Sequence, residues 1–467
     1  MRRFLFFAIA AIFLLDATAY ASPLNLDSPS LILVEQTTGR VLYSHNERER
    51  RYPANLTKML TALVVLEELE PDYVIVVGQE IRNMPAGFAT NVHFEGETIT
   101  VRMLLNSMLI RSSNETGRIL ALNVIRQRDG RGVTWEQANP AFATLLNNKA
   151  RSLGARGTQF NNSFGHQSEN HFTTAYDLAL ITRAFMDNPI LAEIAGTRTF
   201  EGNSLNGTEH TAPNVREYSW TNTNQMLPDA PHGHPYMIGA KAGFTVSAGH
   251  ILAGAAEHNG IQLVTVVLGG TDAARWQDTR RLMDYGFGNF SFREIARSGE
   301  ILSEVLIENP RLGDSETLEV ILGEFSDENE IFTTLLSHTE YTALTKTITF
   351  DPLMYVETEN PTIRAPIEEG AVIGIVTYSA SGTVLFEAPV LASRSVYERT
   401  FDSDMDYHLA AFFGSIFTRK AIPYYFGIFG TVFGIFGIVI AVKTSRRAGR
   451  NAGWTYASGH KSKYNRY

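Results

Sequence analysis

The sequence predicts an α+β protein: an antiparallel sheet packed with helices, then a small all-β domain and one C-terminal transmembrane helix. Strand-like runs stand near both ends of residues 22–290, with helix-like runs between them, which favours one sheet closed by the two ends of the segment. Short alternating apolar runs follow at 291–395, and a charge-free apolar run occupies 421–442. The chain has 467 residues, 44% of them hydrophobic and 19% charged, so we expect more than one globular unit.

Residues 1–21 predict a secretory signal peptide. Two arginines precede an apolar run at 4–15, and the small residues of 19–21 suit cleavage after Ala21. A membrane helix is the alternative, but the run is short and Asp16 interrupts it. The chain contains no cysteine, which excludes disulfides and thiolate metal sites.

Periodicity and turn residues predict the elements of residues 22–290. One hairpin is expected around the Thr-Thr-Gly-Arg turn at 37–40, and another around Asn-Gly at 259–260, because Asn-Gly favours tight hairpin turns. Between the hairpins, apolar residues at helical spacing predict buried helices at 56–66 and 101–109 and a half-exposed helix at 175–182. A further helix after the second hairpin is expected to end near residue 290.

The C-terminal part predicts a separate domain and a membrane anchor. Residues 291–395 read as short strands, including a hairpin around Ser381 and Gly382, and 396–420 form a connector. The run at 421–442 is long enough to cross a bilayer. Gly430 and Gly434 could support helix association, although glycine is common in membrane helices.

The charge distribution predicts the orientation in the membrane and limits the partners. The tail at 443–467 carries seven basic and no acidic residues, which predicts a plasma-membrane protein with a cytoplasmic tail and extracytoplasmic domains. Without this tail and the leader, residues 22–420 keep 31 of the 40 basic side chains and 48 of the 49 acidic ones, a balance of −17. An acidic domain of this kind argues against a nucleic acid partner.

Three short motifs carry the chemistry. Residues 55–58 read Asn-Leu-Thr-Lys, residues 112–114 read Ser-Ser-Asn, and residues 241–243 read Lys-Ala-Gly. In order and spacing they resemble the Ser-x-x-Lys, Ser-x-Asn and Lys-Thr-Gly motifs of penicillin-binding proteins and serine β-lactamases. Stretches such as FNNSFG, TNTNQML and AVIGIV extend the resemblance to low-molecular-mass D-alanyl-D-alanine carboxypeptidases over about 28–395. The resemblance implies a β-lactamase/transpeptidase-like domain at 22–290 and the family's C-terminal β domain at 291–395.

The first motif has a physical reading of its own. Positions i and i+3 of a helix share a face, so a side chain at 55 lies beside the amine of Lys58. A neutral lysine can accept a hydroxyl proton, and a second cation lowers its pKa enough to make it neutral. The resemblance implies that Lys241 is this cation, that Ser112 passes the proton to the leaving amine, and that Asn114 orients Lys58 and the substrate.

The resemblance also assigns the residues that bind the substrate. The strand of the third motif, with Gly243, lines the cleft as an edge that pairs with a peptide. The backbone N–H groups of Asn55 and Phe244 form the oxyanion hole. At position 242 the family's threonine binds the carboxylate of the terminal D-alanine.

This chain departs from the pattern at two of these positions. Asn55 stands where the family has its nucleophilic serine, and Ala242 where it has threonine. A carboxamide cannot form an acyl-enzyme, and loss of a catalytic serine costs about a million-fold in rate. The missing hydroxyl at 242 costs about 1.5–3 kcal/mol of carboxylate binding. Thr57 lies about 200° around the helix from position 55, so Ser112 is the better surrogate nucleophile, although it lies off the oxyanion-hole line.

Plainer readings exist for the same residues. Asn55 could serve as a helix N-cap, Lys58 as a solvated lysine, and Lys241 as a charge that protects a strand edge. His166, His232, His234 and His250 lack metal-ligand spacing and are expected in loops or at the surface, so no metal and no cofactor are predicted.

The sequence therefore predicts a membrane-anchored pseudoenzyme of the carboxypeptidase family. It would bind peptidoglycan stem peptides or regulate, without turnover through an acyl-serine, and the sequence identifies no protein partner. The alternative is an active D-alanyl-D-alanine carboxypeptidase, through a surrogate hydroxyl or because Asn55 is a variant of an active parent. A β-lactamase is less favoured, because Ser113 stands where class A enzymes carry aspartate and because the β domain and span match carboxypeptidases.

Overall fold

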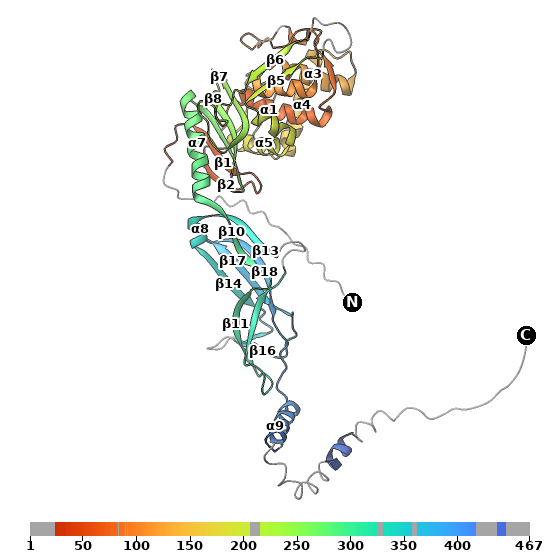
Figure 1. The fold of residues 1–467 in the computed structure, drawn as a ribbon, viewed down its shortest axis with the longest axis vertical. Helices are drawn as coiled ribbons and strands as arrows, with labels where there is room; N and C mark the ends of the chain where they lie inside the picture. Colours follow the sequence, from red (N-terminus) through yellow and green to blue (C-terminus); the bar gives the residue numbers. More distant parts are fainter. Residues whose placement is uncertain are drawn as a thin grey trace, which may run out of the picture. The chain divides into compact units, whose positions relative to one another are not determined.

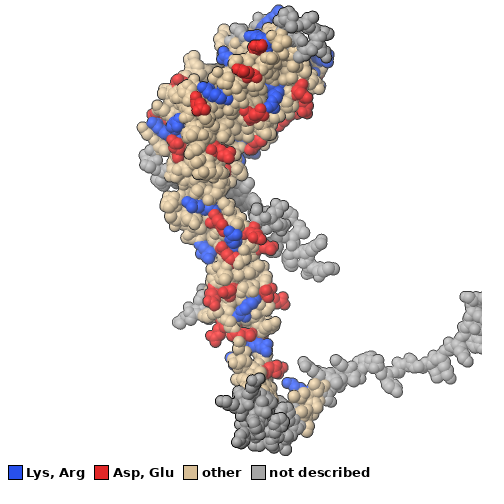
Figure 2. Space-filling model, in the orientation of Figure 1, with Lys and Arg blue, Asp and Glu red and all other residues tan. Residues whose placement is uncertain are grey.

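The computed structural model describes residues 24–82, 84–88, 90, 92–205, 215–324, 330–356, 362–416 and 437–444. The chain forms two compact units, Met1–Phe292 with Leu335–Thr339 and Arg293–Thr334 with Glu340–Tyr467. The first combines helices with sheets and the described core of the second is a sheet (Figure 1), so the predicted α+β class is confirmed. Acidic and basic side chains are interspersed on the face that Figure 2 shows, without an extended region of one sign.

The predicted signal peptide, most of the predicted span and nearly all of the basic tail lie outside the described residues. Of the predicted connector, residues Phe401–Ile416 form helix α9. Within the described ranges, no helix combines the length and the apolar character that crossing a bilayer requires.

The first unit is built on a five-stranded antiparallel sheet with the order β2-β1-β9-β8-β7. Its strands are β1 (Ser30–Glu35), β2 (Val41–His45), β7 (Met237–Thr245), β8 (Gly249–His258) and β9 (Ile261–Gly270). β1 pairs with β9 so that Leu31 lies opposite Val267. The two predicted hairpins are therefore joined in one sheet, as expected, and β7 is left at its edge.

Both faces of this sheet are covered. Ile32 and Val34 of β1 pack into the core that contains α1 (Thr57–Glu68), whereas Leu31 and Leu33 pack with Leu282 of α7 (Asp272–Asn289). Successive side chains of a strand point to opposite faces, so the unbroken apolar run of β1 serves two cores.

Helix α1 runs through the middle of the helical layer. Every residue of its stretch 57–65 is buried, and α3 (Asn114–Asp129), α4 (Trp135–Ser152) and α5 (Ala175–Asp187) contact it. Figure 1 shows α1, α3, α4 and α5 across the five-stranded sheet from α7. The prediction that this helix is buried on more than one side is confirmed. The remaining elements of the unit are small: β3 (Val74–Val76), β4 (Thr98–Thr100), β5 (Thr199–Asn203), β6 (Glu217–Thr221), α6 (Pro189–Gly196) and the 3₁₀ turns Ala54–Leu56 and Gln79–Ile81.

The segment before the second motif differs from the expected regular helix at 101–109. Helix α2 (Val101–Asn106) continues as a π-helical turn, Ser107–Arg111. That turn ends at Ser112, whose φ of 66° is left-handed. Such π-turns are rare and tend to occur at functional sites. Apolar periodicity indicates a helix here but does not distinguish a π-turn from an α-helical one.

The second unit contains a seven-stranded sheet with the order β14-β17-β18-β12-β11-β16-β15. These strands are β11 (Ile301–Glu308), β12 (Thr317–Leu322), β14 (Leu344–Phe350), β15 (Tyr355–Val356), β16 (Thr362–Arg364), β17 (Val372–Ala380) and β18 (Thr383–Ala392). The predicted hairpin is the β17–β18 pair, whose turn residues Ser381 and Gly382 have φ of 49° and 82°, as a type I′ turn requires. Strands β10 (Phe290–Arg297) and β13 (Ile331–Ser337) pair with each other, and α8 spans His338–Thr342.

Candidate functional site

Asn55 lies in the 3₁₀ turn that leads into α1, and the loop 162–166 supports this turn. Ala54 has a φ of 41° and Gly165 a φ of 92°. A Cβ atom on Gly165 would lie 2.0 Å from the carbonyl oxygen of Ala54, so only glycine allows the loop to approach this closely. The Asn162 carboxamide oxygen accepts the backbone N–H groups of Gly165 and His166 at 2.8 and 2.9 Å.

The Asn55 side chain bonds to Lys58 and does not cap the helix. Helix α1 has Leu56 as its N-cap, without a side-chain hydrogen bond, so the reading of Asn55 as the cap is wrong. Its Oδ1 atom instead accepts a hydrogen bond from Lys58 Nζ at 3.0 Å. The expected i, i+3 neighbours therefore do lie together, with a carboxamide as the partner of the amine.

Lys58 is completely buried and surrounded by oxygen atoms. Besides Asn55, its Nζ lies 2.6 Å from Asn114 Oδ1, 3.1 Å from the Ser112 carbonyl oxygen and 3.4 Å from Ser112 Oγ. Burial first, and then the charge of Lys241, holds the pKa of Lys58 well below its usual value, because an unsolvated cation is costly. A solvated lysine is therefore excluded.

Lys241 on β7 is also buried, at 1% exposure, so it is not a lysine that protects a strand edge. Its Nζ donates to Thr223 Oγ1 at 3.0 Å and to the Ala242 carbonyl oxygen at 3.2 Å. Burial, and next the charge of Arg275, lowers the pKa of Lys241 to about 7. Below that pH Lys241 is a cation that opposes protonation of Lys58.

The other third-motif residues lie at the edge of the sheet beside Asn55. A Cβ atom on Gly243 would lie 3.3 Å from Asn55 Cβ, so the bare glycine brings β7 against the nucleophile position. Ala242 packs among buried apolar side chains with Leu252 and Trp276. Phe244 is about half exposed, at 49%, and its ring centroid lies 4.3 Å from that of His250.

Sequence reasoning missed two residues of this site, Thr223 and Arg275. The backbone N–H of Thr223 donates to the Ile110 carbonyl oxygen at 3.2 Å, just before the second motif. The Thr223 hydroxyl accepts the hydrogen bond from Lys241 Nζ. Arg275 of α7 donates from Nη1 to the Gly243 carbonyl oxygen at 3.1 Å. Thr223 lies within the TNTNQML stretch, but nothing in its spacing pointed to a lysine, and no motif pointed to Arg275.

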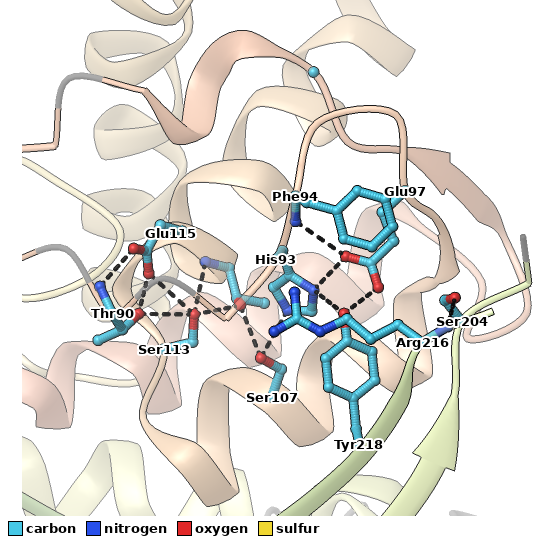
Figure 3. A network of polar contacts seen from close by, with 12 residues as sticks. Thr90, His93, Phe94, Glu97, Ser107, Ser113, Glu115, Ser204, Arg216 and Tyr218 are labelled. Carbon is cyan, nitrogen blue, oxygen red and sulfur yellow. Dashed lines mark hydrogen bonds and ion pairs between the residues drawn. The ribbon is translucent and has the colours of Figure 1, made fainter. Parts of the chain in front are cut away.

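A chain of polar side chains fixes the second motif from behind (Figure 3). Ser113 caps α3 and accepts the Thr116 hydroxyl at 2.7 Å, and Thr116 contacts the Ser107 hydroxyl at 3.0 Å. Ser107 Oγ lies 2.8 Å from His93 Nε2, and His93 Nδ1 lies 2.9 Å from Glu97 Oε2. The π-helical turn that carries Ser107 is thus tied to the start of α3.

Ser107, His93 and Glu97 follow the order of a hydroxyl–imidazole–carboxylate triad, but all three are buried. The Tyr218 hydroxyl donates to the second Glu97 oxygen. Because the Ser107 hydroxyl is buried, a substrate cannot reach it. The three residues instead help to hold the second motif in place. A buried network whose members are all bonded is rigid.

A second set of bonds fixes Asn114 itself. Its backbone N–H donates to Thr90 Oγ1 at 3.2 Å and its carboxamide donates to the Phe88 carbonyl oxygen at 2.8 Å. The carboxamide oxygen is therefore aimed at Lys58. Among the residues that the structure describes, no group of three or more His, Asp or Glu side chains could hold a metal ion.

Together these contacts place the buried Lys58 amine beside a carboxamide at position 55. The Lys58 amine could take a proton from a hydroxyl at position 55, and the edge strand β7 stands beside it. Among the described residues, the side-chain hydroxyl that accepts a hydrogen bond from Lys58 Nζ is that of Ser112, at 3.4 Å. The arrangement suits binding of an extended peptide and activation of a hydroxyl group that Asn55 does not supply.

Known proteins are similar in sequence to the part of the chain that holds this site. Residues 17–272 match a family model described as D-alanyl-D-alanine carboxypeptidase. The D-alanyl-D-alanine carboxypeptidase DacF of Bacillus subtilis is 24% identical over 391 residues, which cover 81% of this chain and 88% of the relative. DacC of Escherichia coli is 26% identical over 408 residues, which cover 84% of this chain and 91% of that protein.

Solved structures share the fold. Penicillin binding protein 5 of Haemophilus influenzae aligns with a TM-score of 0.55 and 22% identity over 81% of this chain and 100% of its own. The D-alanyl-D-alanine carboxypeptidase DacD of Francisella tularensis aligns with a TM-score of 0.58 and 21% identity. The alignment covers 81% of this chain and 95% of that protein. The expected resemblance to low-molecular-mass penicillin-binding proteins is confirmed. Because the family model spans more than half of its residues, the chain belongs to the D-alanyl-D-alanine carboxypeptidase family.

Proposed function

We propose that the chain is a catalytically silent member of this family that binds peptidoglycan stem peptides ending in D-Ala-D-Ala. The observation that carries the proposal is the 3.0 Å bond between Lys58 Nζ and Asn55 Oδ1. A carboxamide oxygen accepts this bond and has no proton for the amine to remove. Acyl transfer to a serine hydroxyl therefore has no starting point, while the base that would begin it is retained.

The rest of the cleft supports a binding role. Arg275 and, below about pH 7, Lys241 bring cations to β7, and a carboxylate near Ala242 would lie beside them. Charge-assisted hydrogen bonds are about twice as strong as neutral ones, so these cations can offset the missing threonine hydroxyl. The edge of β7 offers backbone groups to an extended peptide.

The proposal includes export and membrane anchoring. The predicted signal peptide at 1–21 and the apolar run at 421–442, followed by a basic tail, favour domains that face the cell wall. Many relatives bear the name D-alanyl-D-alanine carboxypeptidase, an activity on the ends of cell-wall peptides. We propose no protein partner.

Covalent labelling tests the silent site. The full-length protein in detergent is incubated with fluorescent penicillin beside Asn55→Ser and Asn55→Ser/Ala242→Thr, and labelled bands are compared on denaturing gels. The unmodified chain should stay unlabelled, Asn55→Ser should label, and the double variant should label faster. Labelling of the unmodified chain that Ser112→Ala abolishes would establish instead an active carboxypeptidase with Ser112 as nucleophile.

Peptide binding tests the retained cleft. A pentapeptide ending in D-Ala-D-Ala should raise the melting temperature of the unmodified protein at millimolar concentration. The same peptide with a C-terminal amide, which lacks the carboxylate, should raise it much less. No response to the free acid would refute the binding role, and hydrolysis of nitrocefin by the unmodified chain would favour a β-lactamase.

A further inference from the structure

The buried polar group behind the second motif also reaches strand β6 (Figure 3). Glu97 joins the two segments, because its Oε2 lies 2.9 Å from His93 Nδ1 and its Oε1 accepts the Tyr218 hydroxyl. His93 in turn contacts the hydroxyl of Ser107, in the π-helical turn, at 2.8 Å. All four side chains are buried, and Tyr218 belongs to β6. The π-helical turn and β6 are therefore tied together through one buried carboxylate.

A second tie between the same two segments ends at Lys241. Thr223 follows β6 by two residues, and its backbone N–H donates to the Ile110 carbonyl oxygen of the π-helical turn at 3.2 Å. Its hydroxyl accepts the Lys241 amine at 3.0 Å. The carboxamide of Asn222 donates to two carbonyl oxygens at the C-terminal end of α6, at 3.2 and 2.9 Å. The backbone on which Thr223 stands is thus held on two sides.

The π-helical turn therefore supports both lysines of the site. It ends at Ser112, whose carbonyl oxygen and hydroxyl lie 3.1 and 3.4 Å from Lys58 Nζ. The charges around the two amines are Arg275, which opposes the charge of Lys241, and Glu115, which favours that of Lys58. The two lysines oppose each other. Two buried amines of like charge need fixed hydrogen-bond partners, because a displaced cation would be left without solvation.

We propose that five residues form one support, the motif frame, that fixes the Lys241 amine relative to Lys58. The frame consists of His93, Glu97, Ser107, Tyr218 and Thr223. Its two positioning residues are Tyr218, which joins β6 to the second motif, and Thr223, whose hydroxyl holds the amine of the third motif. A buried network whose members are all bonded is rigid, so the frame sets the spacing of the two motifs. It needs no bound peptide and is independent of the proposed function.

Amide hydrogen exchange of the full-length protein in detergent tests whether the frame acts as one unit. Tyr218→Phe removes only the hydroxyl that binds Glu97. Exchange should become about tenfold faster at Thr223, beside β6, and also at Ser113, because breaking one link loosens both segments. The Ser113 N–H reports on the second motif, since it donates to the Ser107 carbonyl oxygen at 3.2 Å.

Tyr378→Phe is the matched control. The buried Tyr378 hydroxyl donates to Glu300 Oε1 at 2.8 Å in the second unit, so this variant breaks the same kind of bond outside the frame. It should leave exchange at Thr223 and Ser113 unchanged. If Tyr218→Phe speeds exchange in 217–224 alone, or nowhere, Tyr218 makes only a local contact and the frame is refuted.

Carbon-13 NMR of the lysine Cε atoms tests the role of the Thr223 hydroxyl. The pKa of Lys241 is about 7 in the unmodified chain. Thr223→Val removes an acceptor that stabilises the ammonium form, so this pKa should fall by about one pH unit. Thr223→Ser keeps a hydroxyl and should keep the original pKa, as should Thr221→Val at an exposed position of β6.

The direction of the change separates positioning from a general loosening of the fold. Loosening would admit water to the amine and raise the pKa of Lys241 toward its usual value of 10.5. A rise in Thr223→Val, or no change, would therefore refute the positioning role of Thr223. Because no ligand is added, either result leaves the proposed function to its own tests.

Discussion

With asparagine at position 55, the Lys58 amine keeps the surroundings that lower its pKa but has no hydroxyl there from which to take a proton. In Asn55→Ser that amine gains a hydroxyl, and the rate of penicillin labelling should rise with pH as Lys58 loses its proton. Burial and the Lys241 charge lower the Lys58 pKa, so this rise should begin well below pH 10.5.

Removing the Lys241 charge should shift the pH-dependent rise in labelling rate to higher pH. In Asn55→Ser/Lys241→Gln the Lys58 pKa increases, because a neighbouring like charge is lost, and labelling at pH 7 should slow by about tenfold or more. Stopped-flow labelling between pH 5 and 10 measures the profile. Asn55→Ser/Lys149→Gln, which loses a partly buried lysine that pairs with Glu67 in helix α1, is the control. Identical profiles for the two double variants would contradict the role of Lys241.

His171 makes folding stability depend on pH. Its Nε2 lies 2.9 Å from Thr57 Oγ1 and its Nδ1 accepts the Asn161 N–H at 3.1 Å, which suits the neutral ring. Burial first, then the charge of His166, lowers the pKa of His171 to about 3. The unfolded chain binds one more proton than the folded chain between that value and 6.5, so stability should fall as pH falls through this window.

Urea unfolding at pH 7 and pH 5 measures this effect. The free energy of unfolding should decrease by up to about 1.4 kcal/mol per pH unit below 6.5 from His171 alone. His171→Asn should be less stable at pH 7 but lose less on acidification, whereas the exposed His45→Asn should keep the original slope. An unchanged slope in His171→Asn would contradict the assignment.

Among the elements, the loop at 162–166 determines where the turn before α1 can lie. Gly165→Ala combines a left-handed φ of 92° with a contact of 2.0 Å to Ala54. Gly87→Ala has a similar φ of 78° and open space around the new methyl group, so it carries the backbone strain alone, about 1 kcal/mol.

Gly165→Ala should therefore lower the free energy of unfolding by several kcal/mol more than Gly87→Ala. In the Asn55→Ser background it should also slow penicillin labelling at temperatures where the protein remains folded. Chemical denaturation and gel labelling measure the two effects. Equal stability of the two alanine variants would show that the loop adapts and that Gly165 does not hold the turn.

Local patterns predicted the elements better than they predicted contacts. Two β-prone runs joined by Asn-Gly predicted the β8–β9 hairpin, and apolar spacing predicted a buried helix within two residues of α1 (Thr57–Glu68). The N-cap reading of Asn55 failed because a 3₁₀ turn precedes α1 and Lys58 takes the carboxamide. Thr223 and Arg275 were missed because each joins the site through tertiary contacts with segments that the sequence pattern does not bring together.

The whole molecule combines an acidic part, residues 22–420, for which we propose export, with a proposed membrane anchor at 421–442. A full-length chain expressed in bacteria should stay in the membrane pellet after carbonate washing, because a span of this length is not extracted. A chain that ends at residue 420 should be released by the wash, and both should begin at Ser22. Immunoblots of the fractions measure this, and retention of the truncated chain would show that another segment anchors the protein.

The retained surroundings of Lys58 also bear on how this chain can evolve. Asparagine and serine codons can differ by a single base, and so can those of alanine and threonine. The amine, its oxygen partners and the neighbouring cation already stand around position 55. Where the codons allow it, one base change would place a serine hydroxyl beside this amine and a second would restore threonine at 242, and selection in the presence of β-lactams could recover both.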